Sequence, residues 1–224
     1  MRRSLRYPAL AAVCIAILVA LPASAGTLYE NGPINGETDG WTINFGFVLA
    51  NSFTISTGDS TTVNGVAFGA WLFPGDTMES AQVTLSTESL GGGTVFFDGI
   101  VNFTASNCFL NSYSFDICTE TGNITPTVIG NGTYWMTLQN AVVDNGDPVY
   151  WDENSGVGCH SPGCPSEADN GGIDTPRPDT LPSEAFSILG STGQTTGTVP
   201  EPGSLVLFAG AFAAVVGTLR RKLR

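Results

Sequence analysis

The chain has 224 residues, 20 of them acidic and 8 basic, and a formal net charge of −12. Between residues 26 and 199 there are nineteen acidic residues and one basic residue, Arg177, so this body carries about −18. Such a surface repels nucleic acids and anionic lipid headgroups, so no nucleic-acid partner is expected. Abundant glycine and proline exclude a helical bundle, and 42% hydrophobic content excludes a chain that is disordered throughout.

The first 25 residues have the pattern of a secretory signal peptide. Three arginines precede an apolar run over residues 9–21, and Ala23 and Ala25 supply the small residues of a cleavage site. The alternative is an uncleaved membrane anchor, but the run is shorter than a spanning helix needs, and Pro22 interrupts it. We therefore predict export, with cleavage after Ala25.

The body, residues 26–190, is predicted to be all-β. Apolar residues alternate from Trp41 to Leu49, which indicates one long strand or a hairpin pair that shares a face. Gly, Asn, Asp and Ser clusters separate the segments, which favours an antiparallel β-sandwich or jelly roll. Residues 152–184 are predicted to be a long irregular loop and residues 191–198 a linker. Further strands are expected at residues 66–73, 82–88, 94–104, 112–117, 133–143, 149–151 and 185–189.

Four cysteines lie outside the signal peptide, an even number in an exported chain. Three disulfide connectivities are open, and closeness in sequence favours Cys108 with Cys118 and Cys159 with Cys164. Zinc held by Cys159, His160 and Cys164 is the alternative. A disulfide is favoured because the other two cysteines lie far upstream.

Calcium is a weak candidate ligand of the body. Asp144, Asp147, Asp152 and Glu153 concentrate oxygen ligands in a short stretch, but they lack the spacing of an EF-hand. Solvated acidic turns explain the same pattern, so no metal site and no cofactor are expected.

The sequence gives little support for catalysis. It has one histidine, and it contains no nucleophile elbow, zinc-protease pair or phosphate-binding loop. Because nineteen acids leave many potential pairs, glycoside hydrolysis by paired carboxylates stays open as a second alternative. The expectation is a protein that is not an enzyme.

Four aromatic residues are candidates for stacking against sugar rings, which would make the body a carbohydrate-binding module. Aromatic residues in strands more often belong to the core. Neighbouring residues of a strand point to opposite faces, so one member of each adjacent pair (Tyr134 with Trp135, Tyr150 with Trp151) faces away from the main core. The candidates are Trp71, Trp135, Tyr150 and Trp151.

The last segment, residues 199–224, has three parts in a fixed order. Val199, Pro200, Glu201 and Pro202 precede an uncharged apolar stretch, and a basic cluster follows it. The stretch over residues 204–219 is predicted to be a transmembrane helix, with its basic end in the cytoplasm and the acidic body outside. The two prolines hold the preceding residues extended, so that a processing enzyme can recognise them.

This tripartite segment resembles the PEP-CTERM sorting signal of bacterial exported proteins. The resemblance implies recognition of residues 199–202 by exosortase, a membrane protease-transpeptidase, in hosts that usually make extracellular polysaccharide. Residues 30–33, 41–45, 69–76 and 149–156 resemble segments of uncharacterised PEP-CTERM exoproteins, which implies no chemistry. We expect a non-catalytic structural protein associated with exopolysaccharide, either anchored in the membrane by its helix or released to the cell surface or matrix after processing.

Overall fold

The computed structural model describes residues 26–57, 60–155, 166–170, 173–175 and 183–193. The expected signal peptide, the transmembrane helix at 204–219, and Cys159 and Cys164 lie outside these residues. Within the described ranges, no helix has the length and apolar character needed to cross a membrane.

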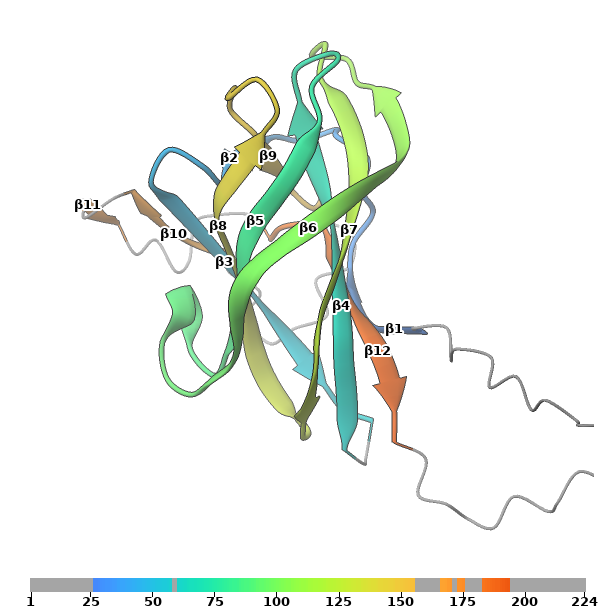
Figure 1. The fold of residues 1–224 in the computed structure, drawn as a ribbon, viewed down its shortest axis with the longest axis vertical. Helices are drawn as coiled ribbons and strands as arrows, with labels where there is room; N and C mark the ends of the chain where they lie inside the picture. Colours follow the sequence, from blue (N-terminus) through green and yellow to red (C-terminus); the bar gives the residue numbers. More distant parts are fainter. Residues whose placement is uncertain (1–25, 58–59, 156–165, 171–172, 176–182, 194–224) are drawn as a thin grey trace, which may run out of the picture.

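The described body is built almost wholly from strands (Figure 1), with one short 3₁₀ turn, η1 (Ser89–Gly91). The strands are β1 (Gly26–Asn31), β2 (Gly40–Thr42), β3 (Phe47–Ile55), β4 (Thr61–Leu72), β5 (Met78–Ser86), β6 (Val95–Leu110), β7 (Asp116–Ile129), β8 (Gly132–Val143), β9 (Tyr150–Asp152), β10 (Ser166–Asn170), β11 (Ile173–Thr175) and β12 (Phe186–Thr192).

All strand pairs are antiparallel, and the order is β1-β12-β4-β7-β6-β5-β8-β3-β10-β11, with β9 joining β2 to β4. β6 turns this arrangement into one curled sheet. Its first half, up to Asn102, pairs with β5, whereas its second half, from Phe103, pairs with β7. The all-β class and the antiparallel pairing are therefore confirmed, and the two layers expected of a sandwich are halves of a single sheet that β6 joins.

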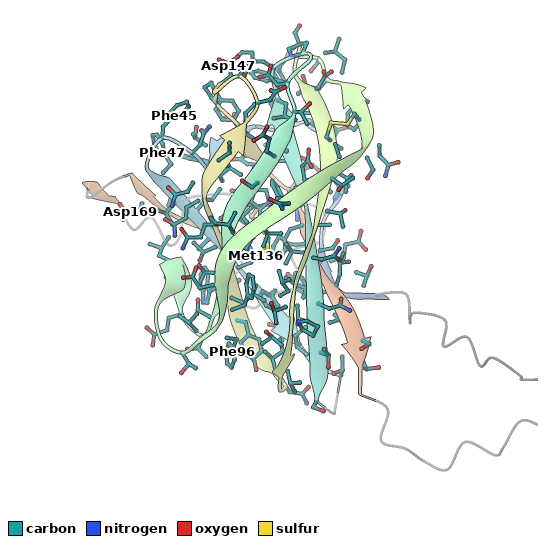
Figure 2. All side chains as sticks on the ribbon, viewed as in Figure 1. Phe45, Phe47, Phe96, Met136, Asp147 and Asp169 are labelled. Atoms are coloured by element: carbon teal, nitrogen blue, oxygen red, sulfur yellow. A yellow bond between two sulfur atoms is a disulfide. The ribbon has the colours of Figure 1, made fainter. Side chains whose placement is uncertain are left out.

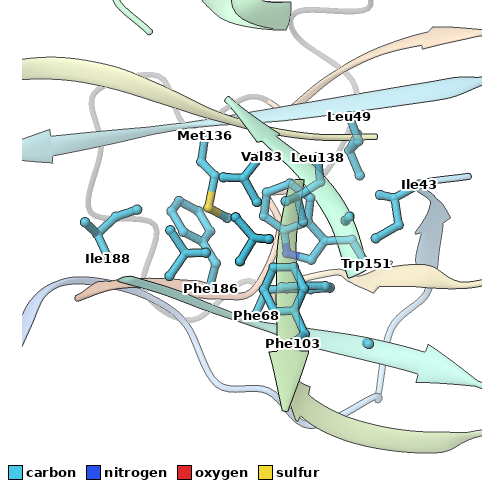
Figure 3. Packing of buried hydrophobic residues seen from close by; sticks show 14 of the residues in the cluster. Ile43, Leu49, Phe68, Val83, Phe103, Met136, Leu138, Trp151, Phe186 and Ile188 are labelled. Carbon is cyan, nitrogen blue, oxygen red and sulfur yellow. The ribbon is translucent and has the colours of Figure 1, made fainter. Parts of the chain in front are cut away.

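The core lies between the two halves of the curled sheet (Figure 3). Leu49, Val83 and Met136 come from the half that contains β3, β5 and β8, and they face Phe68 and Phe186 from β4 and β12. The inward positions recur at every second residue, as a strand with one buried face requires. Burial of this apolar surface is the main stabilising contribution to the fold.

A buried polar cluster ties β1 and β3 to the segment before β12. The side-chain amide of Asn31 donates to the Ser183 hydroxyl and to the Glu184 carbonyl, the latter at 2.6 Å. Asn51 Oδ1 accepts from Ser183 Oγ at 3.2 Å and from the Glu184 backbone N–H at 2.8 Å. Because both asparagines are fully buried, these bonds fix one arrangement of the three segments.

Two sequence expectations need correction. The alternation from Trp41 to Leu49 is neither one strand nor a hairpin, because the backbone turns at Phe45 and Gly46, which both have positive φ. β2 and β3 consequently pair with different strands, β9 and β8. The irregular loop expected over residues 152–184 contains β10 and β11, and β10 extends the sheet beside β3.

The body has two distinct ends, or poles. At the tail pole, Thr192 pairs with Thr61 and Gly26 pairs with Gly190. The first strand, β1, therefore begins at the same pole at which the last strand, β12, ends. The far pole is the other end of β4, around Trp71. Ten residues of strand separate Thr61 from Trp71, which corresponds to roughly 30 Å.

Candidate functional site

A pocket of about 220 Å³ opens at the far pole, lined by Asp39, Gly40, Trp71, Phe115 and Tyr150. Trp71 and Tyr150 face each other across the β4–β9 pair, while Gly40 on β2 lies opposite Asp152 on β9. A Cβ atom at Gly40 would approach Cβ of Tyr150 to 2.9 Å, so the close approach of β2 requires glycine. Two strand pairings between segments distant in sequence, β4–β9 and β2–β9, therefore bring these residues together.

Aromatic rings form its walls. The Phe115 ring centroid lies 5.6 Å from that of Trp71 and 5.8 Å from that of Tyr150, with the Phe115 and Tyr150 planes at 83°. Tyr113 stacks on Trp71 at 5.7 Å and is 55% exposed. Phe73, also exposed, packs on Phe115. The result is a rigid aromatic surface that is partly open to solvent.

The β6–β7 turn holds Tyr113 and Phe115 in position. Asn111 Oδ1 accepts the backbone N–H groups of both residues at 3.0 Å, and Asn111 Nδ2 donates to the Gly36 carbonyl. The Cys108–Cys118 disulfide joins the strands just behind this turn, and Figure 2 shows it as the yellow bond between β6 and β7. This pair is one of the two that the sequence favoured. The turn is thus held by a covalent bond and by hydrogen bonds.

Asp152 fixes the orientation of Trp71. Its Oδ1 accepts from Trp71 Nε1 at 2.6 Å, and its Oδ2 accepts from the backbone N–H groups of Asn35 and Gly36. Burial raises the pKa of Asp152, and these hydrogen bonds oppose the rise because they favour the carboxylate. Asp152 therefore acts as a structural acceptor behind the pocket.

Glu153 and Asp39 lie beside each other, directly after β9 and directly before β2. Glu153 accepts a hydrogen bond from Trp41 Nε1. Burial raises the pKa of Glu153, the Trp41 hydrogen bond lowers it, and the nearby charges of Asp39 and Asp152 raise it further. The Glu153 backbone N–H donates to the Asp39 carbonyl at 2.9 Å. Asp39 Oδ1 accepts from Gly40 N at 2.8 Å, which directs an exposed carboxylate into the pocket lining.

The four residues weighed as calcium ligands divide between two places. Asp144 and Asp147 lie in the turn between β8 and β9, where Asp144 accepts from the Thr77 backbone N–H. Asp152 and Glu153 are buried and bonded to tryptophan N–H groups. In the part of the chain that the structure describes, no three His, Cys, Asp or Glu side chains are grouped to hold a metal. The calcium candidate is therefore wrong as a single site of these four residues.

The four aromatic candidates also separate. Trp71 and Tyr150 meet in the pocket, whereas Trp135 is half-buried on β8, between Ser52 and Ser86. Trp151 is fully buried, and its Nε1 donates to the Ala185 carbonyl. Its ring packs against core phenylalanines, so the expectation that it stacks on a sugar is wrong.

Sequence reasoning missed Asp39, Tyr113 and Phe115. Their partners lie on other strands, and only the short spacing of Tyr113 and Phe115 in one turn hinted at a shared surface.

Sequence reasoning also missed Glu120, a fully buried carboxyl on β7 whose two oxygens have no hydrogen-bond partner among the described residues. Burial raises the pKa of Glu120 to about 7.

Comparison with known proteins gives one match, and it falls outside the pocket. The family model for the PEP-CTERM protein-sorting motif matches residues 198–222. No curated protein and no solved structure matches the chain. The match covers the segment that contains Pro200, Glu201 and Pro202. The chain thus carries a PEP-CTERM sorting signal, which implies export, processing by exosortase and association with the cell surface or membrane.

Proposed function

We propose that this protein is a non-catalytic structural component of the cell surface or of the extracellular polysaccharide matrix. The observation that carries the proposal is the sorting motif at residues 198–222. The arrangement of the body is consistent with it, because β12 ends at the tail pole and the motif follows five residues after the last described residue. The far pole then points away from the membrane.

The environment of the acids supports a non-catalytic role. Asp152 and Glu153 are engaged by the indole N–H groups of Trp71 and Trp41. Glycosidases that act through paired carboxylates need two such groups on either side of a sugar bond. Among the described residues, Asp39 is the single carboxylate that lines the pocket, so the lining favours binding over hydrolysis.

The sorting role is tested by replacing Pro200, Glu201 and Pro202 with alanine in the full chain. Because the two prolines hold the motif extended for the processing enzyme, we expect the variant to remain unprocessed and to lose most of its surface display. Surface display is measured by labelling intact cells, and processing by the shift in size. Alanine at Gln194, Thr195 and Thr196 is the control, and unchanged processing of the motif variant would contradict the proposal.

A second candidate function is carbohydrate binding by the far pole. The observation that favours it is the convergence of Trp71, Phe115 and Tyr150 around one pocket together with a carboxylate. Pockets with aromatic walls and a few placed polar groups are typical small-ligand sites. This function is compatible with the structural role, because a matrix protein that holds polysaccharide needs a point of attachment.

A further inference from the structure

The pocket at the far pole has the chemistry to hold one sugar ring. Phe115 and Tyr150 meet at 83°, so they form two walls at a right angle. The C–H groups on one face of a pyranose are weakly positive and complement the negative face of an aromatic ring. The volume, about 220 Å³, is below the roughly 300–1,000 Å³ of pockets for drug-sized ligands, which suits a single ring.

The charge around the pocket selects the kind of sugar. Asp39 Oδ1 is occupied by Gly40 N, and no described residue donates to its other oxygen. The described residues include no Lys, Arg or His, so an anionic sugar would find no counter-charge there. A protonated amine would instead find both a carboxylate and the faces of aromatic rings, which attract cations.

Further carboxylates surround the same pole. Asp76 lies close enough to Asp147, Asp144 and Asp116 that their charges add to the effect of burial in raising its pKa, against a hydrogen bond from Asn145. These residues come from the turn after β4, the start of β7 and the turn between β8 and β9. The resulting negative potential draws cations towards the pole.

We infer that the pocket binds an unacetylated amino sugar, with its C–H face against Tyr150, its ring edge towards Phe115 and its ammonium group beside Asp39. The inference rests on the second candidate function above and specifies its ligand. The position of the pocket, roughly 30 Å from the tail pole along β4, leaves it open to polysaccharide chains beyond the membrane surface. The body would therefore hold cationic polysaccharide and reject uronic-acid polymers.

The test is a calorimetric titration of the exported, purified protein with three oligosaccharides of equal length. They are a glucosamine oligomer, its fully N-acetylated form and a glucuronic-acid oligomer. We expect binding of the glucosamine oligomer that weakens with added salt, because a carboxylate–ammonium contact is screened. Binding of the acetylated form should be about tenfold weaker, and the glucuronic-acid oligomer should not bind.

Two pairs of variants assign the binding to the pocket. Tyr150→Leu should weaken glucosamine binding about tenfold while Tyr150→Phe retains it, because the ring face supplies the contact. Asp39→Asn keeps a side-chain oxygen as the acceptor for Gly40 N, so the variant should fold normally. Because it removes the negative charge, it should bind the glucosamine oligomer no more tightly than the acetylated oligomer. The matched controls are Trp135→Leu, which removes an aromatic ring elsewhere, and Glu88→Gln, which removes one charge near η1.

Three results would overturn the inference: no binding of the glucosamine oligomer, equal binding of its acetylated form, or unchanged binding by Tyr150→Leu. Thermal unfolding of each variant shows whether a loss of binding follows from misfolding, and Tyr150→Phe and Asp39→Asn decide the question if Tyr150→Leu does not fold. Surface display of the motif variant is an independent measurement, so failure of the amino-sugar site and failure of the sorting role are distinguishable.

Discussion

Glu120 lies in an environment very different from the water that a carboxyl group prefers. It points from β7 into the space between the two halves of the sheet, is fully buried, and has no hydrogen-bond partner for either oxygen among the described residues. Burial alone raises its pKa from 4.5 to about 7, since no nearby charge contributes. The folded protein therefore binds a proton at Glu120 that the unfolded chain has released between these two values.

This difference makes stability depend on pH. We predict that the free energy of unfolding decreases as the pH rises from about 4.5 to about 7, because the folded state holds more protons than the unfolded state in this range. Glu120→Gln should reduce that slope, to which Asp152 and Glu153 also contribute because burial raises their pKa values. It should also raise the free energy of unfolding at pH 8 by about 1–3 kcal/mol, since an amide is less costly to bury than a carboxylate. Urea unfolding across this pH range measures both effects.

Glu79→Gln is the matched control, because Glu79 is exposed at the start of β5. It should leave the contribution of Glu120 to the slope unchanged. A parent protein whose stability is level or rises between pH 4.5 and pH 7, with Glu120→Gln following the same curve, would contradict this account of the buried carboxyl.

At the scale of single elements, the β6–β7 turn depends on its disulfide. Cys108 and Cys118 are ten residues apart, and closing a loop of this length stabilises a fold by about 2–3 kcal/mol through the unfolded chain. Replacing both cysteines by alanine should lower the free energy of unfolding by that amount. It should also weaken ligand binding, because the same turn carries Phe115.

Urea unfolding without reductant measures the loss of stability. Repeating the measurement on the double variant with reductant shows how much of its remaining stability depends on the expected disulfide between Cys159 and Cys164. Equal stability of the parent and the double variant, with unchanged binding, would show that hydrogen bonds from Asn111 are enough to hold the turn.

The strands show how far local pattern determines structure here. Residues 133–143 were predicted as a strand, and β8 runs from Gly132 to Val143. Most of β7 was missed, because two of its inward positions are Glu120 and Gly122 and the apolar alternation is broken. The apolar alternation predicts β2 and β3 as one unit, because it continues through the turn at Phe45. That turn is held by Asn44, whose side chain bonds to the backbone of residues 147 and 149. Such contacts, about a hundred residues apart, have no local signature.

The candidate site also depends on contacts between segments that are distant in sequence. Trp71 and Tyr150 were predictable only as individual candidates, because tryptophan and tyrosine combine a large apolar ring with a polar group. Their meeting depends on the β4–β9 pair, and the contribution of Asp39 depends on β2 pairing with β9. Trp151 was misassigned because alternation shows that Tyr150 and Trp151 face opposite ways without showing which one faces the core.

At the scale of the whole molecule, charge and topology are consistent with the proposed surface role. All described residues lack positive side chains, whereas basic residues follow the apolar stretch after the sorting motif. The tail pole brings the start of β1 and the end of β12 together on one edge of the sheet (Figure 1), so the described body begins and ends at the same pole. The aromatic pocket lies at the opposite pole, in the position expected of a surface that meets extracellular material.

Processing by exosortase at the sorting motif is tested by the intact mass of the protein recovered from host cells with and without their exosortase. We predict that the protein from intact cells lacks residues 1–25 and has lost chain on the C-terminal side of the motif. The protein from exosortase-deficient cells should retain that segment through Arg224. The same C-terminal mass in both strains, with residues 198–224 retained, would contradict the claim.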